Sequence, residues 1–335
     1  MSGVAAGSPL ASSPNSPGVS VIIPTRNRKH FLRRALDSLL QQNYPNLEII
    51  VVDDGSTDGT DELIAEYGNQ IRYFHFEVNQ GPSAARNYAF EHSKNPYIAF
   101  LDSDDYWAPN RLSTLMSAWK EAPESCGIIA NDISLFDDED RHFAPKRLSD
   151  LKSGPITTEQ LLLRNRFAPS AAMMSREAYQ RCGGFDDSLL ASEDRDLWIR
   201  VSQHYSIYFI AKPLTLMRKH PANISKEASR MQTSILAMLR KSYRRAVLPR
   251  WRIDLWLKAL SFGLFVIACL NNYERRTLRA WCFLVSSCMM WPVHTRTRED
   301  LNEPVLFRLR MFYHFLSVRL ATKTRPTSRK LAKTA

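Results

Sequence analysis

The sequence lacks the features that mark several protein classes. Its five cysteines are odd in number and none stands in a CxxC pair, so we expect neither a disulfide framework nor a zinc ribbon, but buried, reduced thiols in a cytosolic protein. The N-terminus has neither a basic start nor an apolar run, which predicts no signal peptide. No apolar run of about 20 residues is free of charge, so the sequence contains no unambiguous transmembrane helix. With 44% hydrophobic residues, the 335-residue chain can still bury a sizeable core.

Charge is distributed unevenly along the chain. Residues 1–230 hold 25 Lys and Arg against 29 Asp and Glu, whereas residues 231–335 hold 20 against 5. The first region is typical of a soluble enzyme that can bind cations, and the second suits an anionic partner such as a lipid surface or nucleic acid. Residues 1–18 are rich in Ser, Pro, Gly and Ala and are expected to form a disordered leader.

The basic C-terminal region is also rich in aromatic residues. Its longest apolar run is Ala259–Leu270, and a second run, Trp281–Val293, is interrupted by Ser and Pro. Arginines mixed with apolar and aromatic side chains are typical of helices that lie in a membrane interface; a helical subdomain whose aromatics pack internally is the alternative. Because no recognition motif accompanies the charge, nucleic acid is not expected as a partner.

Strands and helices alternate in the first region. Apolar residues at helical spacing fill the intervals between four short apolar runs that predict buried strands. These strands are Val19–Ile23, Leu47–Val52, Ile71–Phe76 and Tyr97–Leu101. The alternation predicts an α/β fold with a mostly parallel sheet covered by helices on both faces.

Polar clusters follow three of these strands, and ligands of such sheets bind beyond the carboxyl ends of the strands. The clusters are Pro24-Thr25-Arg26, Asp53-Asp54 and Asp102-Ser103-Asp104. Two acids spaced i and i+2 in a turn can meet one Mg²⁺ or Mn²⁺, whose shell is completed by water and phosphate oxygens. An Asx turn with helix caps is the alternative, but the acidic pair after the second strand favours metal binding.

Five ordered motifs carry a family resemblance. They are VSVIIPTRNR at 19–28, EIIVVDDGSTDGT at 48–60, NQGPSAARN at 79–87, YIAFLDSDDYW at 97–107 and SEDRDLWIR at 192–200. Together they resemble the family 2 glycosyltransferases, over roughly residues 18–225. The resemblance implies the Rossmann-like GT-A fold, inverting transfer from a nucleotide sugar, with UDP as the expected nucleotide, and a divalent cation, Mn²⁺ or Mg²⁺.

The resemblance also implies roles for individual residues. Asp104 would ligate the metal, and Asp102 would face the ribose or the metal. Asn87 would either contact the ligand or have a structural role within its helix. The nucleotide-sugar site would comprise Pro24, Thr25, Arg26, Asp53, Asp54, Arg86, Asp102, Ser103, Arg218 and His220. Arg218 offers planar, bidentate contacts to a diphosphate, whereas an ordinary exposed residue is the alternative for His220.

In this family's pattern, the Asp of an acidic pair such as Glu193-Asp194 is the general base. Inversion by single displacement requires that a proton leave the acceptor hydroxyl as it attacks the anomeric carbon. A positioned base accelerates such a step by about 10²–10⁴. The alternative for both acids is stabilisation of a helix N-terminus through its dipole.

The expected organisation is a glycosyltransferase domain at 19–225 and a helical region at 226–335 that is peripheral on the cytoplasmic face of a membrane. A glycan or polyprenyl-linked acceptor of surface polysaccharide or glycolipid synthesis would lie there. A nucleotidyltransferase is one alternative, but it would require a Gly-rich loop where this sequence has PTRNR. A non-catalytic sugar-nucleotide-binding or scaffolding domain is another, but it would be expected to lose an acidic position, and all four are present: Asp54, Asp102, Asp104 and Asp194.

Overall fold

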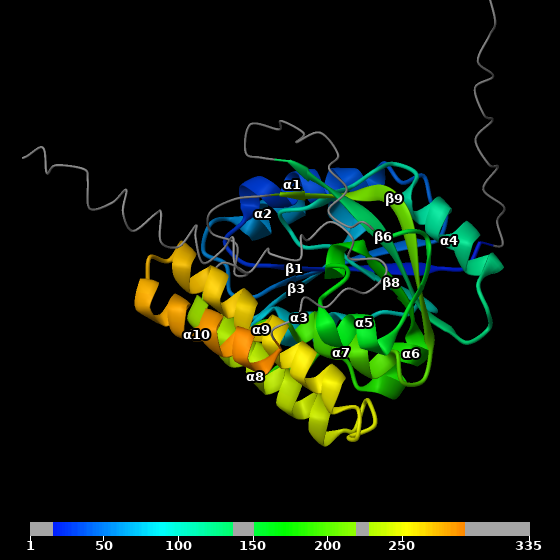
Figure 1. Cartoon of the computed structure of the whole chain (residues 1–335). Coiled ribbons are helices and arrows are strands. Elements are labelled where there is room, and N and C mark those ends of the chain that lie inside the picture. Colours follow the sequence, from blue (N-terminus) through cyan, green and yellow to red (C-terminus); the bar gives the residue numbers. More distant parts are fainter. Residues whose placement is uncertain (1–15, 137–150, 219–227, 292–335) are drawn as a thin grey trace, which may run out of the picture. The chain divides into compact units, whose positions relative to one another are not determined.

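The computed structural model describes residues 16–136, 151–218 and 228–291. The chain divides into two compact units (Figure 1). Met1–Leu161 with Asn165–Pro221 form the first, called the sheet unit, and Leu162–Arg164 with Ala222–Ala335 form the second, called the helical unit. Residues 1–15 of the predicted leader lie outside the described residues. Of the remainder, the carbonyl of Pro17 accepts a hydrogen bond from the Tyr44 hydroxyl at 2.7 Å.

Nine strands of the described residues form one mixed sheet in the order β3-β2-β1-β4-β8-β6-β9-β5, with β7 beside β9. The strands are β1 (Val19–Thr25), β2 (Leu47–Asp53), β3 (Ile71–His75), β4 (Tyr97–Phe100), β5 (Tyr106–Trp107), β6 (Cys126–Phe136), β7 (Gly154–Ile156), β8 (Ala172–Ser175) and β9 (Ser206–Arg218). From β3 to β4 all pairs are parallel. Beyond β4 only β6 and β9 pair in parallel, because β8 runs antiparallel between β4 and β6, and β5 and β7 run antiparallel to β9.

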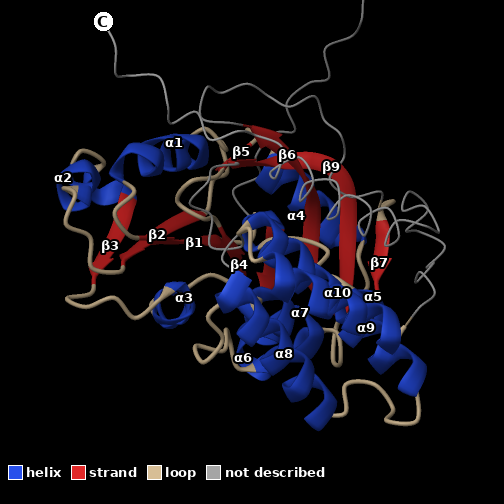
Figure 2. Cartoon of the chain, turned by 60° about the vertical axis from the view of Figure 1, so that its left-hand side comes forward, coloured by secondary structure: helices blue, strands red, loops and turns tan. Residues whose placement is uncertain are grey.

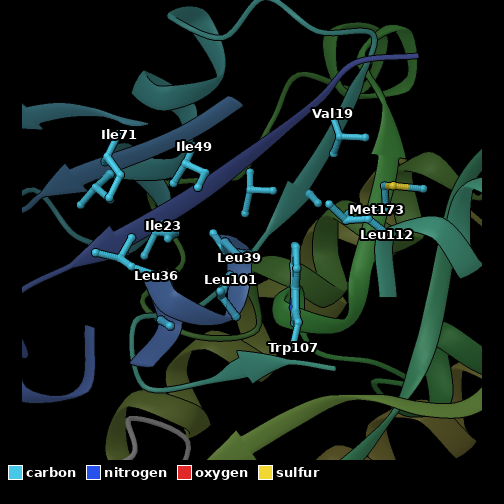
Figure 3. Packing of buried hydrophobic residues seen from close by; sticks show 14 of the residues in the cluster. Val19, Ile23, Leu36, Leu39, Ile49, Ile71, Leu101, Trp107, Leu112 and Met173 are labelled. Carbon is cyan, nitrogen blue, oxygen red and sulfur yellow. The ribbon is translucent and has the colours of Figure 1, made fainter. Parts of the chain in front are cut away.

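Helices cover both faces of the parallel half, as predicted. Those of the sheet region are α1 (Lys29–Leu40), α2 (Thr60–Ala65), α3 (Pro82–Glu91), α4 (Arg111–Glu121), α5 (Thr158–Leu163), α6 (Arg176–Cys182) and α7 (Glu193–Val201), with 3₁₀ turns at Gly68–Gln70 and Pro169–Ala171. Figure 2 shows α1 and α2 on one face of β1–β3 and α3 on the other. Buried Leu32, Leu36 and Leu39 form one stripe of α1. They pack with alternate strand residues such as Ile23 and Ile49 in the cluster of Figure 3.

Aromatic side chains fill part of the opposite face. The Phe185 ring meets Phe100 of β4 edge-on at 5.2 Å and Trp198 of α7 at 6.2 Å between centroids. Tyr179 of α6 stacks on Phe90 of α3 at 4.1 Å. These contacts join α3, α6 and α7 to the sheet beneath them.

The first strand was predicted to end at Ile23, directly before Pro24, and this end is wrong because β1 runs through Pro24 to Thr25. Its pairing with β4 stops at Ile22, whose carbonyl accepts the Leu101 N–H at 3.0 Å. Residues 22 and 24 point their backbone groups to the same side of the strand. The N–H that proline lacks would therefore face a side where pairing has already ended.

The helical unit contains α8 (Ala228–Arg244), α9 (Ile253–Tyr273) and α10 (Thr277–Met290), which lie side by side in Figure 1. Ser261 of α9 and Ser287 of α10 donate hydrogen bonds to each other's carbonyls at 2.8 and 2.7 Å. Among the residues that the structure describes, α9 is long and apolar enough to cross a membrane by length and composition. It extends beyond the predicted apolar run at both ends. At its N-terminal end the additional turns contain the charged residues Asp254 and Lys258.

Candidate active site

The carboxyl ends of β1, β2 and β4 lie at one edge of the sheet because these strands are parallel. Thr25, the last residue of β1, is in register with Asp53, the last residue of β2. The Asp54 N–H then donates to the Thr25 carbonyl at 2.8 Å. Residues 102–105 leave β4 at the same edge. The sheet thus brings together the three polar clusters singled out in the sequence.

Asp53 and Asp54 are buried and hold the loops around them. Asp53 accepts hydrogen bonds from the Ser56 N–H and the Tyr73 hydroxyl, both at 2.8 Å. Asp54 accepts the backbone N–H groups of residues 80 and 81 at 2.6 and 2.8 Å. Gly81 has φ +91°, a conformation that favours glycine. The two carboxylates therefore set the path of the chain into α3 and shape the edge of the sheet.

Residues 24–27 lie between the clusters that follow β2 and β4, because β1 is placed between these two strands. Pro24 and Thr25 are buried and Arg26 is exposed. The Thr25 Oγ1 is buried without a hydrogen-bond partner among the described residues. Asn27, with φ +51°, donates its N–H to Ser56 Oγ at 2.8 Å. The loop that carries Arg26 is thus tied to the loop that follows β2.

Each acid of the predicted metal pair contacts an arginine. Arg86 of α3 donates to Asp102 Oδ1 at 2.6 Å, and Arg28 contacts Asp104 Oδ2 at 2.5 Å. The Asp102 side chain is 32% exposed and that of Asp104 10%, so both lie near the surface of the edge. The described part of the chain holds no cluster of three or more His, Cys, Asp or Glu that could bind a metal. Two carboxylates fit a hard cation that takes its other ligands from water and a diphosphate.

The third acid of this loop, Asp105, was not singled out in the sequence and is directed inward. It accepts hydrogen bonds from the Ser170 hydroxyl at 2.6 Å and the Arg218 N–H at 3.0 Å. Burial, and then the nearby carboxylates of Asp104 and Asp102, raise the pKa of Asp105 well above its usual range. Ser170 also accepts the Asp102 N–H at 3.0 Å. Asp105 and Ser170 thus anchor the loop; the run of acids was the signal for the first, whereas nothing in the sequence marked Ser170.

Arg86 links this loop to α7. Its guanidinium is buried, lies over the Phe185 ring at 5.0 Å, and donates both to Asp102 and, at 3.1 Å, to Glu193 Oε1. The carboxylates of Asp102 and Glu193 raise the pKa of Arg86 despite the opposing effect of burial. Residues 86, 102 and 193 are thereby assembled into one charged group.

Asp194 is the first buried acid of α7. Its Oδ2 accepts a hydrogen bond from the Asn165 side chain at 2.7 Å, and its Oδ1 accepts the Arg195 N–H at 2.6 Å. Burial, with a further contribution from Glu193, raises the pKa of Asp194 to about 7. Such a carboxyl can accept a proton near neutral pH. Asn165 stands in no motif, and no sequence signal marks it.

Other motif residues have structural contacts. Asn87 accepts the Tyr179 hydroxyl at 2.5 Å and the Phe185 N–H at 2.9 Å, and so holds the loop after α6. Asp196 is fully buried and pairs with Arg200 at 2.8 Å. Asn87 thus has the contacts of a structural role, and they reach a loop outside its own helix.

Of the two basic residues predicted to contact the diphosphate, Arg218 lies among the described residues. Arg218 ends β9, is buried, and places its guanidinium over the rings of Phe31 and Phe136 at 4.6 and 4.5 Å. His220 lies outside the described residues. Ser103 is buried within the acidic loop.

A mixed sheet whose parallel half carries this acidic edge is typical of a GT-A-like glycosyltransferase fold, and solved structures share the fold. S. aureus TarS (residues 1–349) in complex with UDP-GlcNAc has a TM-score of 0.55 at 18% identity and covers 86% of this chain and 98% of its own. The mannosyltransferase PcManGT from Pyrobaculum calidifontis, solved with GDP-Man and Mn²⁺, has a TM-score of 0.57 at 18% identity, covering 94% and 84%.

The chain belongs to glycosyltransferase family 2 and is a transferase enzyme. The Glycosyl transferase family 2 model matches residues 20–183. A Rickettsia typhi glycosyltransferase is 32% identical over 215 residues, which are 64% of this chain and 67% of the relative. A Rickettsia bellii glycosyltransferase is 33% identical over 64% of this chain but only 31% of its own length. The putative teichuronic acid biosynthesis glycosyltransferase TuaG of Bacillus subtilis is 38% identical over 122 residues, 36% of this chain and 48% of TuaG.

Proposed function

We propose that this enzyme transfers a sugar, with inversion, from a UDP-linked donor to a hydroxyl of a glycan or lipid-linked acceptor during the synthesis of a surface polysaccharide or glycolipid. The name of the TuaG relative supports a role in polysaccharide synthesis. The observation that carries the proposed chemistry is the position of Asp194: a buried carboxyl with a pKa of about 7, linked through Glu193 and Arg86 to the acidic loop at the sheet edge.

In the proposed step, the acceptor oxygen forms a bond to the anomeric carbon while the bond from that carbon to the diphosphate breaks. The acceptor proton passes to Asp194 Oδ2, and the departing nucleoside diphosphate keeps the electron pair. Arg86 holds Asp102 and Glu193 in place on either side of its guanidinium. Its charge also lowers the pKa of Asp194 and so opposes the effect of burial.

The base is tested by exchanging each acid of the pair for its amide. Asp194→Asn keeps the shape but cannot accept the proton, so transfer should fall by about 10² or more while donor affinity is retained. Glu193→Gln is the matched control and should retain more transfer. Normal transfer by Asp194→Asn together with loss in Glu193→Gln would move the role to Glu193. A panel of UDP-, GDP- and dTDP-sugars, assayed for hydrolysis with and without Mn²⁺, identifies the donor for these measurements.

Asp104 and Asp102 would hold Mn²⁺ or Mg²⁺ at the sheet edge. A cation there would neutralise charge on the departing diphosphate. Asp104→Ala should abolish the Mn²⁺-dependent part of UDP binding in calorimetry and leave the fold intact, because the residue lies at a strand end. Unchanged UDP affinity in the presence of Mn²⁺ would contradict the assignment.

We also propose that the helical unit holds the enzyme at the cytoplasmic face of an anionic membrane. Three exposed residues of α10, Leu278, Val285 and Met289, lie at i, i+7 and i+11 on one side of the helix and are 79%, 42% and 75% exposed. Arg275 and Arg276 are exposed just before this helix. Each basic residue near an anionic leaflet contributes about 1 kcal/mol, and the apolar side chains can enter the interface beneath the headgroups.

Fractionation tests this location. The full-length protein should sediment with membranes, leave them only in part at high salt, and be released by detergent. Release by alkaline carbonate is expected of a peripheral protein, whereas retention would indicate that α9 spans the bilayer. A protein wholly in the supernatant at low salt would instead show that the helices pack as a soluble subdomain.

A further inference from the structure

Two hydrogen-bond donors contact the carboxylate of Asp194, and they differ in origin. The Arg195 N–H, on Oδ1, belongs to the helix that carries Asp194 and moves with it. The Asn165 side chain, on Oδ2, comes from a segment 29 residues earlier. Of the described residues, Asn165 is therefore the donor that fixes this carboxylate relative to another part of the fold.

The segment that carries Asn165 is itself fixed along α7. On one side of Asn165, the Arg195 Nε donates to the Leu161 carbonyl at 2.8 Å. On the other side, the indole N–H of Trp198 donates to the Phe167 carbonyl at 3.3 Å. These two bonds bracket Asn165, so its amide is held beside Asp194 although the residue itself is exposed.

The charged groups around Asp194 have opposing effects on it. Glu193, its neighbour on α7, raises the pKa of Asp194, and Arg86 from α3 lowers it. The guanidinium of Arg195 is directed to the Leu161 carbonyl. A donor to a carboxylate favours the ionised form, so the bond from Asn165 acts in the same direction as Arg86 and against burial.

We infer that Asn165 is a positioning residue for Asp194, holding its carboxylate ionised and in one orientation at the N-terminus of α7. The inference rests on the proposed function only where it concerns catalysis. The contact between Asn165 and Asp194 can be tested without any substrate.

The first experiment is a carbon NMR titration of the whole protein labelled at the carboxyl carbon of aspartate. Asp194→Asn identifies the Asp194 resonance by removing it. Its midpoint should move to higher pH by about one pH unit in Asn165→Ala, since a hydrogen bond to a charged group is lost. Asn165→Asp places a like charge at the same distance and should move the midpoint further. Asn165→Gln keeps the amide, has room because the position is exposed, and should restore most of the parent value.

Asn46→Ala is the matched control. Asn46 is also an exposed asparagine with one side-chain hydrogen bond, to the Ser16 carbonyl at 2.5 Å. It precedes β2 at the edge of the sheet opposite to the acidic loop. Its replacement should leave the Asp194 midpoint and the transfer rate unchanged.

The second experiment measures the pH dependence of kcat/KM for the donor that the sugar-nucleotide panel identifies. The acidic limb should move upward in Asn165→Ala by the same amount as the NMR midpoint, with about a tenfold loss below that limb and recovery above it. An unmoved midpoint in Asn165→Ala and Asn165→Asp would overturn the inference and leave the proposed base in place. A moved midpoint with full transfer by Asp194→Asn would instead overturn the proposed base, and the positioning role in catalysis with it.

Discussion

The sheet unit and the helical unit differ in the polar groups that they bury. Below the surface of the sheet unit lie carboxylates, and each of Asp53, Asp54, Asp105 and Asp194 accepts hydrogen bonds from donors on a neighbouring loop or segment. The buried polar groups that pair within the helical unit are small and uncharged, such as the hydroxyls of Ser261 and Ser287.

The described part of the helical unit exposes more large apolar side chains than that of the sheet unit. Trp251, Leu278 and Met289 of the helical unit are each about three-quarters exposed, at 75%, 79% and 75%. Burying a charge is costly unless it is paired, and leaving a large apolar side chain in water forgoes the stabilisation that burial would bring. Each unit thus departs from the simplest stable arrangement at the place where a ligand is expected: a nucleotide sugar for the first and a lipid surface for the second.

The largest expected effect concerns the buried carboxyl of Asp194, which should make the free energy of unfolding depend on pH. Burial raises the pKa of Asp194 to about 7, above its value in the unfolded chain, so the folded state binds this proton more tightly. The stability linked to that proton is complete below the unfolded pKa and is lost as the pH rises through about 7. Asp194→Asn should therefore raise the free energy of unfolding by up to about 4 kcal/mol at high pH and little at low pH.

Chemical denaturation near pH 8 and near pH 5 measures this difference. Asn46→Ala, which removes no titratable group from an exposed position, is the control and should have the same effect at both pH values. Equal effects of Asp194→Asn at both pH values would contradict the expectation.

The next largest effect is expected where one buried cation holds two acids. Arg86→Met leaves Asp102 and Glu193 without their shared partner, and breaking a buried pair in this way costs about 3 kcal/mol. The comparison is Arg33→Met, which removes an exposed pair with Glu66 and should cost far less. Urea unfolding followed by tryptophan fluorescence gives both values; similar losses would mean that the Arg86 group adds nothing beyond a surface pair.

Substitutions in the helical unit should change membrane binding and not the transfer reaction. Replacing Leu278, Val285 and Met289 together by Gln removes apolar surface without changing charge. It should lower partition onto anionic vesicles by about 100-fold, at about 1 kcal/mol for each side chain. Replacing Arg275, Arg276 and Arg279 by Gln should instead reduce the salt-sensitive part of binding. If neither set changes sedimentation with vesicles, α10 does not face the membrane.

The smallest effect concerns packing within the helical unit. A Cβ at Gly263 of α9 would lie 2.9 Å from Ile235 Cγ2 and 3.4 Å from Leu239 Cδ1 of α8. Because Ile235 Cγ2 is attached directly to Cβ of a stiff, β-branched side chain, the close contact requires a small shift of the helices, and Gly263→Ala should cost about 1 kcal/mol. Thermal unfolding measures it against Ser286→Ala, a half-exposed position on α10; an increase in stability would show that α8 and α9 have room to separate.

The parallel half of the sheet was predictable because its strands are buried on both faces and so form continuous apolar runs. The second half was less so. β5 and β7 have two and three residues, too few to show a period. The antiparallel direction of β8 depends on which strands lie beside it. The end of β1 was predicted wrongly because the effect of Pro24 on a strand depends on where pairing with β4 ends.

Within the candidate site, the acidic residues could be found from the sequence because they stand in motifs next to strand ends. The different contacts that these acids make could not be predicted from the sequence. The spacing of the acidic loop does not show that Asp105 turns inward to Ser170 while Asp102 and Asp104 contact arginines. Nor does it reveal Asn165, a neutral residue in a connecting segment, because its importance comes only from what lies 2.7 Å away.

The sequence by itself determined the family, the strand and helix alternation and the acidic residues proposed to carry the chemistry, because these depend on local residue types and their spacing. Only the tertiary structure decided which carboxylates are buried and which donors reach them. Residues 86, 102, 165, 193 and 194 meet through contacts between separate elements. The raised pKa of Asp194 has the same origin, because burial and a neighbouring charge are properties of the folded chain and not of the residue.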